Sequence, residues 1–199
     1  YDERYSASAV VVSPDGQEVA GIGRLSQHGA RAWSVGSGKH RRLPKADFTP
    51  RQLAYDFAMK RVAFARPDRG SAGPGAGVDI HDLKTGDRVY QLSGSSEAQD
   101  LAFSPDGNVL VAATAAGVLA WDLSTARPRA VFLTEDESDS VIFSSPDILR
   151  ISSRGGAVLQ TFSFSEERVI ETFDGRGGRA ACWSPDGLFL AVAGSKGVR

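Results

Sequence analysis

The stretch from Leu101 to Leu123 decides the fold, and it reads LAFSPDGNVLVAAT followed by AAGVLAWDL. Short runs of Val, Leu, Ala and aromatic residues alternate here with Gly, Pro, Asp and Ser, which is typical of β-strands joined by tight turns. In Ser104–Gly107, Pro presets φ near about −65°, Asp tolerates the next position, and Gly accepts the left-handed one that closes a G1 bulge. The pattern predicts four strands of five or six residues: Asp100–Ser104, Val109–Thr114, Gly117–Leu123 and Arg129–Leu133.

The second of these strands is apolar on both sides. Side chains alternate between the faces of a strand, so Val109, Val111 and Ala113 share one face while Leu110 and Ala112 share the other. A lone sheet of about 40 residues cannot bury two faces, whereas successive copies arranged side by side around an axis can. The strand therefore predicts a repeat architecture.

The repeat is visible in the sequence. Ser-Pro-Asp-Gly occurs at Ser13–Gly16, Ser104–Gly107 and Ser184–Gly187, spacings of 91 and 80 residues, or about two periods each. Degenerate copies stand midway, at Tyr55–Ala58 and at Phe143–Asp147. We predict an all-β fold, a β-propeller of four-stranded antiparallel blades.

The stretch from Leu101 to Leu123 resembles a WD40 repeat, whose third strand commonly ends in Trp-Asp, here Trp121-Asp122. Trp33-Ser34, His81-Asp82 and Phe162-Ser163 are similar to that dipeptide in degraded form. WD40 repeats often carry a histidine before the first strand and an Asp between the second and third strands, which form a buried hydrogen-bonded tetrad with a Ser or Thr and the Trp. The chain departs from that pattern, because none of its three histidines precedes a first strand and the turns at Gln27–Gly29, Ala115–Gly117, Arg154–Gly156 and Ser195–Gly197 carry no Asp. Blade cohesion would then depend more on apolar contact. Repeats rich in Ser-Pro-Asp-Gly also resemble TolB-type and peptidase-associated propellers.

The repeats divide the 199 residues into units at about 6–48, 49–94, 95–134, 135–175 and a truncated 176–199. We therefore expect an incomplete ring, four blades plus part of a fifth, within a longer parent protein of six to eight blades. The alternative is a five-bladed ring in which residues 1–5 supply a closing strand. If the ring is incomplete, the remaining blades of the parent chain are expected partners.

Composition excludes several classes of protein. The chain is 41% hydrophobic, carries a formal charge of −1 and has one cysteine, so it has no internal disulfide and no overall charge that favours nucleic acid. No apolar run approaches the roughly 18 residues of a membrane helix. We expect no membrane insertion and a cytoplasmic protein, and the bias toward arginine over lysine resembles that of GC-rich bacterial genomes.

The chemistry-bearing motifs favour ordinary turns. Gly36–His40 lacks the first glycine and the final Ser or Thr of a phosphate loop, so we interpret it as a turn between third and fourth strands. Arg69–Gly77 lacks dinucleotide-binding spacing and is interpreted as a long loop. Cys182 is expected to be a buried small hydrophobe, and the three histidines do not have zinc-ligand spacing. We expect no cofactor, no metal and no catalysis.

The remaining hypothesis is partner binding. In a propeller, the loops that join second to third strands, and one blade to the next, gather on one face. Charged residues in those loops form the predicted partner-binding set: Arg24, His28, Glu135, Asp136, Glu137, Arg154, Arg176 and Arg179. The leading hypothesis is a noncatalytic scaffold that binds a protein or peptide there. The alternatives are a gating propeller of a serine peptidase, with its catalytic domain outside the chain, and a TolB-like periplasmic propeller.

Overall fold

A computed structural model of the chain describes residues 7–23, 29–56, 58–68, 75–94, 97–125, 130–134, 137–153, 158–174, 180–184, 189–194 and 197–198. All regular structure in these ranges is β-strand. They contain no helix long and apolar enough to cross a bilayer. The chain divides into two compact units, Tyr1–Ala98 and Gln99–Arg199.

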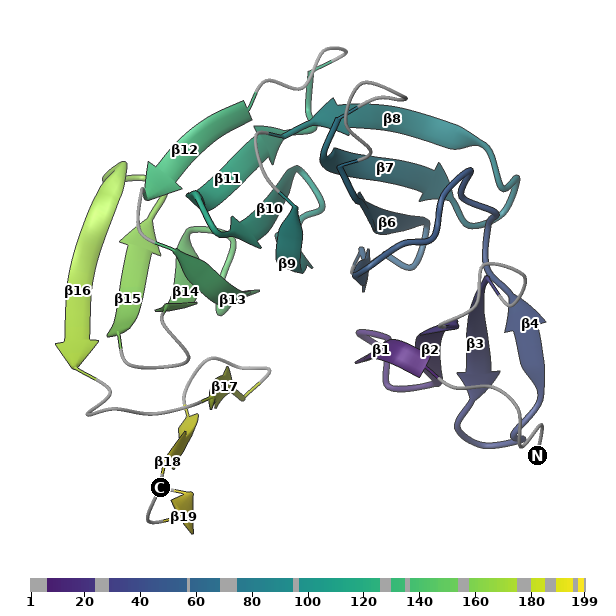
Figure 1. Cartoon of the computed structure of the whole chain (residues 1–199), viewed down its shortest axis with the longest axis horizontal. Coiled ribbons are helices and arrows are strands. Elements are labelled where there is room, and N and C mark those ends of the chain that lie inside the picture. The colour runs from purple at the N-terminus through teal and green to yellow at the C-terminus, as the bar shows by residue number, and fades with distance from the viewer. Residues whose placement is uncertain are drawn as a thin grey trace. The chain divides into compact units, whose positions relative to one another are not determined.

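Each complete sheet is a four-stranded antiparallel meander in which strands pair in chain order (Figure 1). The first unit holds two such sheets: β1 (Ala7–Val12), β2 (Glu18–Gly23), β3 (Ala30–Ser34) and β4 (His40–Arg42), then β5 (Leu53–Tyr55), β6 (Arg61–Arg66), β7 (Gly77–Asp82) and β8 (Arg88–Ser93). The second unit holds two complete sheets: β9 (Ala98–Phe103), β10 (Val109–Thr114), β11 (Gly117–Asp122) and β12 (Ala130–Thr134), then β13 (Ser138–Phe143), β14 (Ile148–Ser153), β15 (Val158–Ser163) and β16 (Arg168–Asp174). A three-stranded sheet of β17 (Ala180–Trp183), β18 (Leu190–Gly194) and β19 (Gly197–Val198) follows.

The described residues therefore form four complete blades and part of a fifth, which confirms the predicted fold class. Strand β10 has the predicted bounds, but its neighbours are shifted at their ends. Strand β9 begins two residues early and ends at Phe103, because Ser104 already belongs to the turn. Strand β11 ends at Asp122, since the Leu123 amide donates to Asn108 O at 2.6 Å. Gly77, expected in a loop, opens β7.

Two of the three Ser-Pro-Asp-Gly turns, at Ser13–Gly16 and Ser104–Gly107, have the predicted geometry, and most of the third, Ser184–Gly187, lies outside the described residues. The amide of Gly16 donates to Ser13 O and that of Gly107 to Ser104 O, with φ of 68° and 72° at the glycines. The serine hydroxyl oxygen also accepts the amide hydrogen bond of the first residue of the next strand, at 2.9 Å for Ser104 and Val109. Each turn is thus closed by backbone and side chain together.

Face-to-face packing of neighbouring blades forms the core of each unit. In the first, Ala20, Ile22 and Ala32 of the first blade pack with Val62 and Phe64 of the second. In the second, Val111 and Val118 of the third blade pack with Phe143, Leu149 and Ile151 of the fourth. Residues 110–113 are at most 1% exposed, which confirms that both faces of β10 are buried.

Candidate functional site

Each blade has two chemically different ends. We call the end with the connections between first and second and between third and fourth strands the turn end. The opposite end, which carries the connections between second and third strands and between blades, is the loop end. From the sequence, partner binding is predicted at loop ends.

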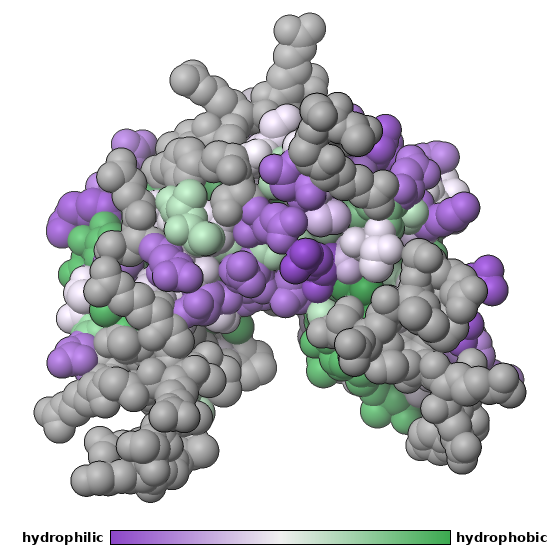
Figure 2. Space-filling view, viewed as in Figure 1, coloured by the Kyte–Doolittle hydropathy of each residue, from purple (hydrophilic) through white to green (hydrophobic). Residues whose placement is uncertain are grey.

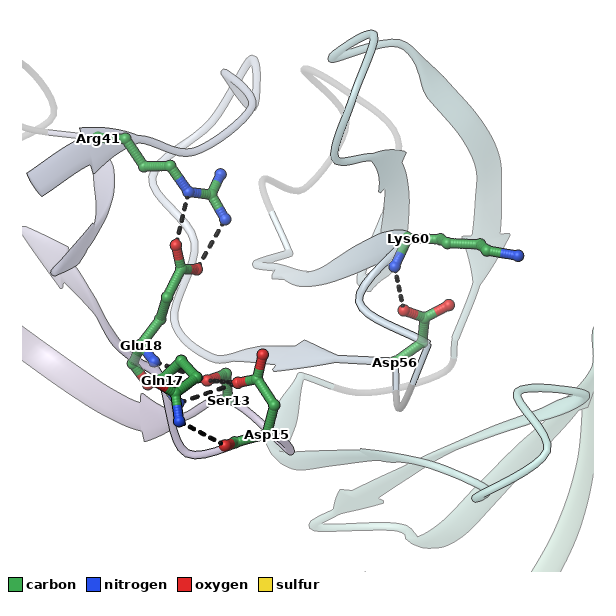
Figure 3. Close-up of polar contacts among 7 residues, drawn as sticks. All are labelled: Ser13, Asp15, Gln17, Glu18, Arg41, Asp56 and Lys60. Carbon is green, nitrogen blue, oxygen red and sulfur yellow. Dashed lines mark hydrogen bonds and ion pairs between the residues drawn. The ribbon is translucent and has the colours of Figure 1, made fainter. Parts of the chain in front are cut away.

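At the turn end of the first blade, the acidic side chain stabilises its own turn (Figure 3). Asp15 Oδ1 accepts hydrogen bonds from the Ser13 hydroxyl at 2.6 Å and the Gln17 amide at 3.0 Å. These bonds, with the serine hydroxyl first, lower the pKa of Asp15. Asp106 in the third blade has the same arrangement with Ser104 and Asn108, and its pKa is also lowered. These carboxylates have a structural role.

An ion pair lies near a buried tyrosine beside that turn. Arg41 of β4 donates to both oxygens of Glu18, from Nε at 2.9 Å and from its terminal nitrogen at 2.7 Å (Figure 3). Tyr55 of β5 lies near both side chains and is 5% exposed. Burial, then the negative charge of Glu18, raises the pKa of the Tyr55 hydroxyl well above its usual value, so it stays protonated. It is available as a hydrogen-bond donor, not as a base.

The turn of the second blade uses a carboxylate where the first and third use serine. Asp56 Oδ1 accepts the amides of Lys60 at 2.7 Å and Arg61 at 3.0 Å, and Oδ2 pairs with Arg61 Nε at 2.9 Å. Met59 occupies the glycine position of the turn with φ of 51°. Asp56 is 1% exposed, so its charge also serves the fold.

At the loop end of the first unit, one carboxylate connects three different loops. Glu97, just before β9, accepts the Asp68 amide at 3.1 Å, and its other oxygen lies 3.3 Å from Arg51 Nε. Arg51 lies between β4 and β5, and Asp68 follows β6. The Arg51 side chain remains 65% exposed. Arg51 therefore extends its positive charge into solvent from a loop that Glu97 connects to two others.

A buried ionic network lies just beneath this end of the second blade. Arg66 and Asp79 form an ion pair with both side chains at most 4% exposed, and Arg88 of β8 lies 3.1 Å from the other Asp79 oxygen. Arg66 also donates to Gly75 O at 2.9 Å and Leu92 O at 3.0 Å. It therefore joins β6, β7, β8 and the end of the loop between β6 and β7.

A second carboxylate joins the two blades of the second unit. Asp100 on β9 accepts hydrogen bonds from the Ser140 hydroxyl at 2.8 Å and the Val141 amide at 3.1 Å, both on β13. Burial raises the pKa of Asp100, against the effect of these hydrogen bonds.

Most of the predicted partner-binding set lies outside the described residues. This applies to Arg24, His28, Glu135, Asp136, Arg154, Arg176 and Arg179, and to the side chain of Cys182. Glu137 is described and is exposed, just before β13. Sequence reasoning missed Arg51, Glu97 and Asp100. In the described ranges, no three His, Cys, Asp or Glu side chains are grouped to hold a metal ion.

The fold has many solved relatives, although no protein-family model and no curated protein matches the sequence. The chain is similar to Kuenenia stuttgartiensis hydrazine synthase, with a TM-score of 0.74 and 16% identity over 97% of this chain and 70% of that one. It is similar to the Myceliophteria thermophila Cps50 (Swd1) β-propeller domain, with a TM-score of 0.77 and 13% identity over 96% and 63%. It is also similar to U3-55K, with a TM-score of 0.67 and 17% identity over 87% and 53%.

These likenesses show the fold alone. The chain has a WD40-like β-propeller fold, and it spans between half and 70% of the length of these structural relatives.

Proposed function

We propose that the chain is part of a noncatalytic scaffold, and that loop ends of its blades bind a protein or peptide. The observation that carries the proposal is the anchoring of three loops by Glu97, with Arg51 left 65% exposed. A binding surface gains affinity when its side chains are ordered before the partner arrives, because less conformational entropy is lost on association. The propeller relatives support an interaction domain only in general terms.

The contrast between the two blade ends supports the same assignment. At the turn ends, Asp15, Asp82, Asp106 and Asp122 accept hydrogen bonds within their own turns, and each has a lowered pKa for that reason. Their charge stabilises the turns. At the loop end of the first unit, Arg51 combines an ion pair to Glu97 with a side chain that is mostly solvated, which suits recognition of a partner carboxylate.

Site-specific photo-crosslinking tests the proposal. A photoreactive amino acid replaces Arg51 in one variant and Lys84, which is exposed at a turn end, in a matched variant. We expect a crosslinked protein with the Arg51 probe and none with the Lys84 probe. Equal crosslinking from both positions would reject the loop end as the binding surface.

Charge reversal then tests the captured partner directly. Arg51→Glu is expected to weaken binding at least about fivefold, because one charge-assisted contact contributes on the order of 1 kcal/mol or more. Lys84→Glu should leave affinity unchanged. The pair Arg176→Glu and Arg179→Glu tests the predicted set in the same assay, and retention of full affinity would remove those two residues from the site.

A further inference from the structure

The outer strand of the first blade consists of basic residues alone. Five basic side chains, all exposed, lie within a span of seven residues, and we call them the basic edge: Lys39, His40, Arg41, Arg42 and Lys45. Three of them make up the whole of β4. None of the other complete blades has two consecutive basic residues in its fourth strand. Figure 2 shows hydrophilic surface along the flank where Figure 1 draws β4, and mixed hydrophobic and hydrophilic surface where it draws β16.

The same strand has an open backbone edge. The amide of Ser34 donates to Lys39 O at 2.8 Å, and this bond flanks the cross-strand pair of Trp33 and His40. In an antiparallel ladder such a pair exchanges no hydrogen bonds of its own, so the N–H and C=O of His40 point away from β3. Arg42 lies two residues further along and has the same orientation. Both residues therefore direct backbone donors and acceptors toward the outer edge of the blade.

A neighbouring blade would leave these positions exposed. In the second blade, cross-strand register places Arg88 and Gln91 where the first blade has His40 and Arg42. That face of the second blade packs against residues of the first, and Val62 there is 0% exposed. Arg88 and Gln91 nevertheless remain exposed. The basic edge is therefore an available surface whether or not another blade precedes the first.

Protection against chance strand pairing does not explain the basic edge. Charged residues commonly protect long, apolar edge strands from such pairing. Strand β4 is the shortest fourth strand of the four complete blades and has no apolar residue. Strand β16 is the longest and exposes Ile170 and Phe173 at 38% and 46%. The run of basic side chains thus lies on the strand that needs protection least.

We propose that the basic edge binds an extended acidic segment of a partner protein, which adds to the first blade as a further strand beside β4. The backbone groups of His40 and Arg42 form hydrogen bonds with the segment, and main-chain bonds of this kind supply affinity. Charge supplies specificity, because acidic side chains at alternate positions of the added strand lie opposite His40 and Arg42. Arg41 points to the other face, where it donates to Glu18 at 2.7 Å.

A peptide is the occupant that uses both features of this strand. A nucleic acid would use the positive charge but not the open backbone edge, whereas an acidic peptide strand uses the two together. The basic edge does not include Arg51, and the proposal is independent of the proposed function.

Peptide binding to the full chain tests the proposal. The probe is a labelled peptide of alternating Glu and Val, about ten residues long. Fluorescence anisotropy measures its association constant, and hydrogen exchange follows single amides of the chain. We expect the amides of His40 and Arg42 to exchange at least about fivefold more slowly at saturating peptide, because they gain acceptors. Arg42→Glu should lower the association constant at least about fivefold, because an attractive cross-strand pair becomes repulsive.

The controls separate strand addition from charge attraction alone. Arg168→Glu reverses an exposed cation on β16, another outer strand, and should leave the association constant within about twofold. The same peptide with alternate backbone amides methylated keeps its charge but loses main-chain donors, so it should bind at least about tenfold more weakly.

Several outcomes would overturn the proposal. These are absence of peptide binding, equal binding of the methylated peptide, equal effects of Arg42→Glu and Arg168→Glu, and unchanged exchange at His40 and Arg42. A duplex oligonucleotide that binds more tightly than the peptide, with the same loss in Arg42→Glu, would assign the basic edge to phosphate groups and also overturn it.

Discussion

In the second and third blades, the second and third strands pair in the same register but carry different chemistry at equivalent positions. Near the loop end, Arg66 faces Gly77 across the ladder and Asp79 lies on the same side. In the third blade these positions hold Thr114, opposite Gly117, and Leu119. Thr114 donates to Gly117 O at 2.8 Å, and Leu119 is 2% exposed. One backbone geometry therefore accommodates either a buried ion pair or a hydroxyl with an apolar side chain.

The turn ends of these blades also differ. Ser104 and Gly107 close the turn of the third blade with a hydroxyl and a residue that adopts positive φ without strain. Asp56 and Met59 occupy the same positions in the second blade, and the carboxylate accepts two amides where the hydroxyl accepts one. The comparison indicates that a blade depends on filling each hydrogen-bonding position rather than on a particular residue.

The largest expected effect on stability comes from breaking the buried ion pair between Arg66 and Asp79. Asp79→Ala leaves the Arg66 guanidinium buried without its counter-charge, so we expect a loss of about 3–5 kcal/mol in the free energy of unfolding, measured by urea denaturation. Leu119→Ala in the third blade should cost about 2–4 kcal/mol through its cavity. The double variant Arg66→Thr with Asp79→Leu installs the chemistry of the third blade and should recover most of the loss. If the double variant were as unstable as Asp79→Ala, the residues of the third blade could not replace the ion pair of the second.

The second-largest expected effect comes from adding a side chain at Gly77, which lies against the Arg66 guanidinium. A Cβ on Gly77 would lie 2.1 Å from Leu92 O and 2.6 Å from the Arg66 guanidinium, so backbone or arginine must move. We expect Gly77→Ala to cost about 2 kcal/mol or more in thermal or urea unfolding. Gly36→Ala, where a Cβ meets nothing within 4 Å, is the matched control and should cost far less. Similar costs at both positions would mean that Arg66 does not need the glycine.

A smaller effect on stability distinguishes the turn ends of the second and third blades. Gly107→Ala forces a side chain into the left-handed region and should cost about 1 kcal/mol. Met59→Gly relieves that strain in the second blade but removes packing against the core, so its net effect should stay below about 0.5 kcal/mol. Unfolding midpoints of the two variants provide the measurement. A large loss in Met59→Gly would show that packing, not backbone conformation, selects methionine there.

The smallest effect is a pH dependence within the third blade. The raised pKa of Asp100 means that the folded chain binds its proton more readily, so its contribution to stability falls as pH rises through the window above about 4. Asp106 has a lowered pKa, so its contribution is present above about 4 and is lost as pH falls through the folded value. Relative to the native chain, Asp100→Asn should therefore gain stability with rising pH and Asp106→Asn should lose it. Parallel profiles from unfolding titrations would contradict these assignments.

The fold was predictable because its signals are local. The turn at Ser104–Gly107 and the two apolar faces of β10 are encoded within a few neighbouring residues, and the repeat supplied the remaining blades. The Arg66–Asp79 pair had no such signal, because an arginine beside a glycine-rich loop is usually solvated and its partner stands 13 residues away. The contact between Asp100 and Ser140 did have a signal in the sequence. The two residues are 40 residues apart, which is one repeat period, and equivalent strands of consecutive blades lie side by side. Arg51 and Glu97 are in loops without regular spacing, where sequence does not specify which loops meet.

The route of Arg66 over Gly77 also constrains how the second blade can evolve. Loss of Asp79 leaves the Arg66 guanidinium buried without its counter-charge, so replacement of Asp79 should be accepted only when Arg66 changes too. A side chain at Gly77 also meets the backbone oxygen of Leu92, whichever residue stands at position 66. Arg66 and Asp79 should therefore change together, while Gly77 stays glycine. The neutral counterparts Thr114 and Leu119 can vary one at a time, and related chains should show covariation in one blade and independent substitution in the other.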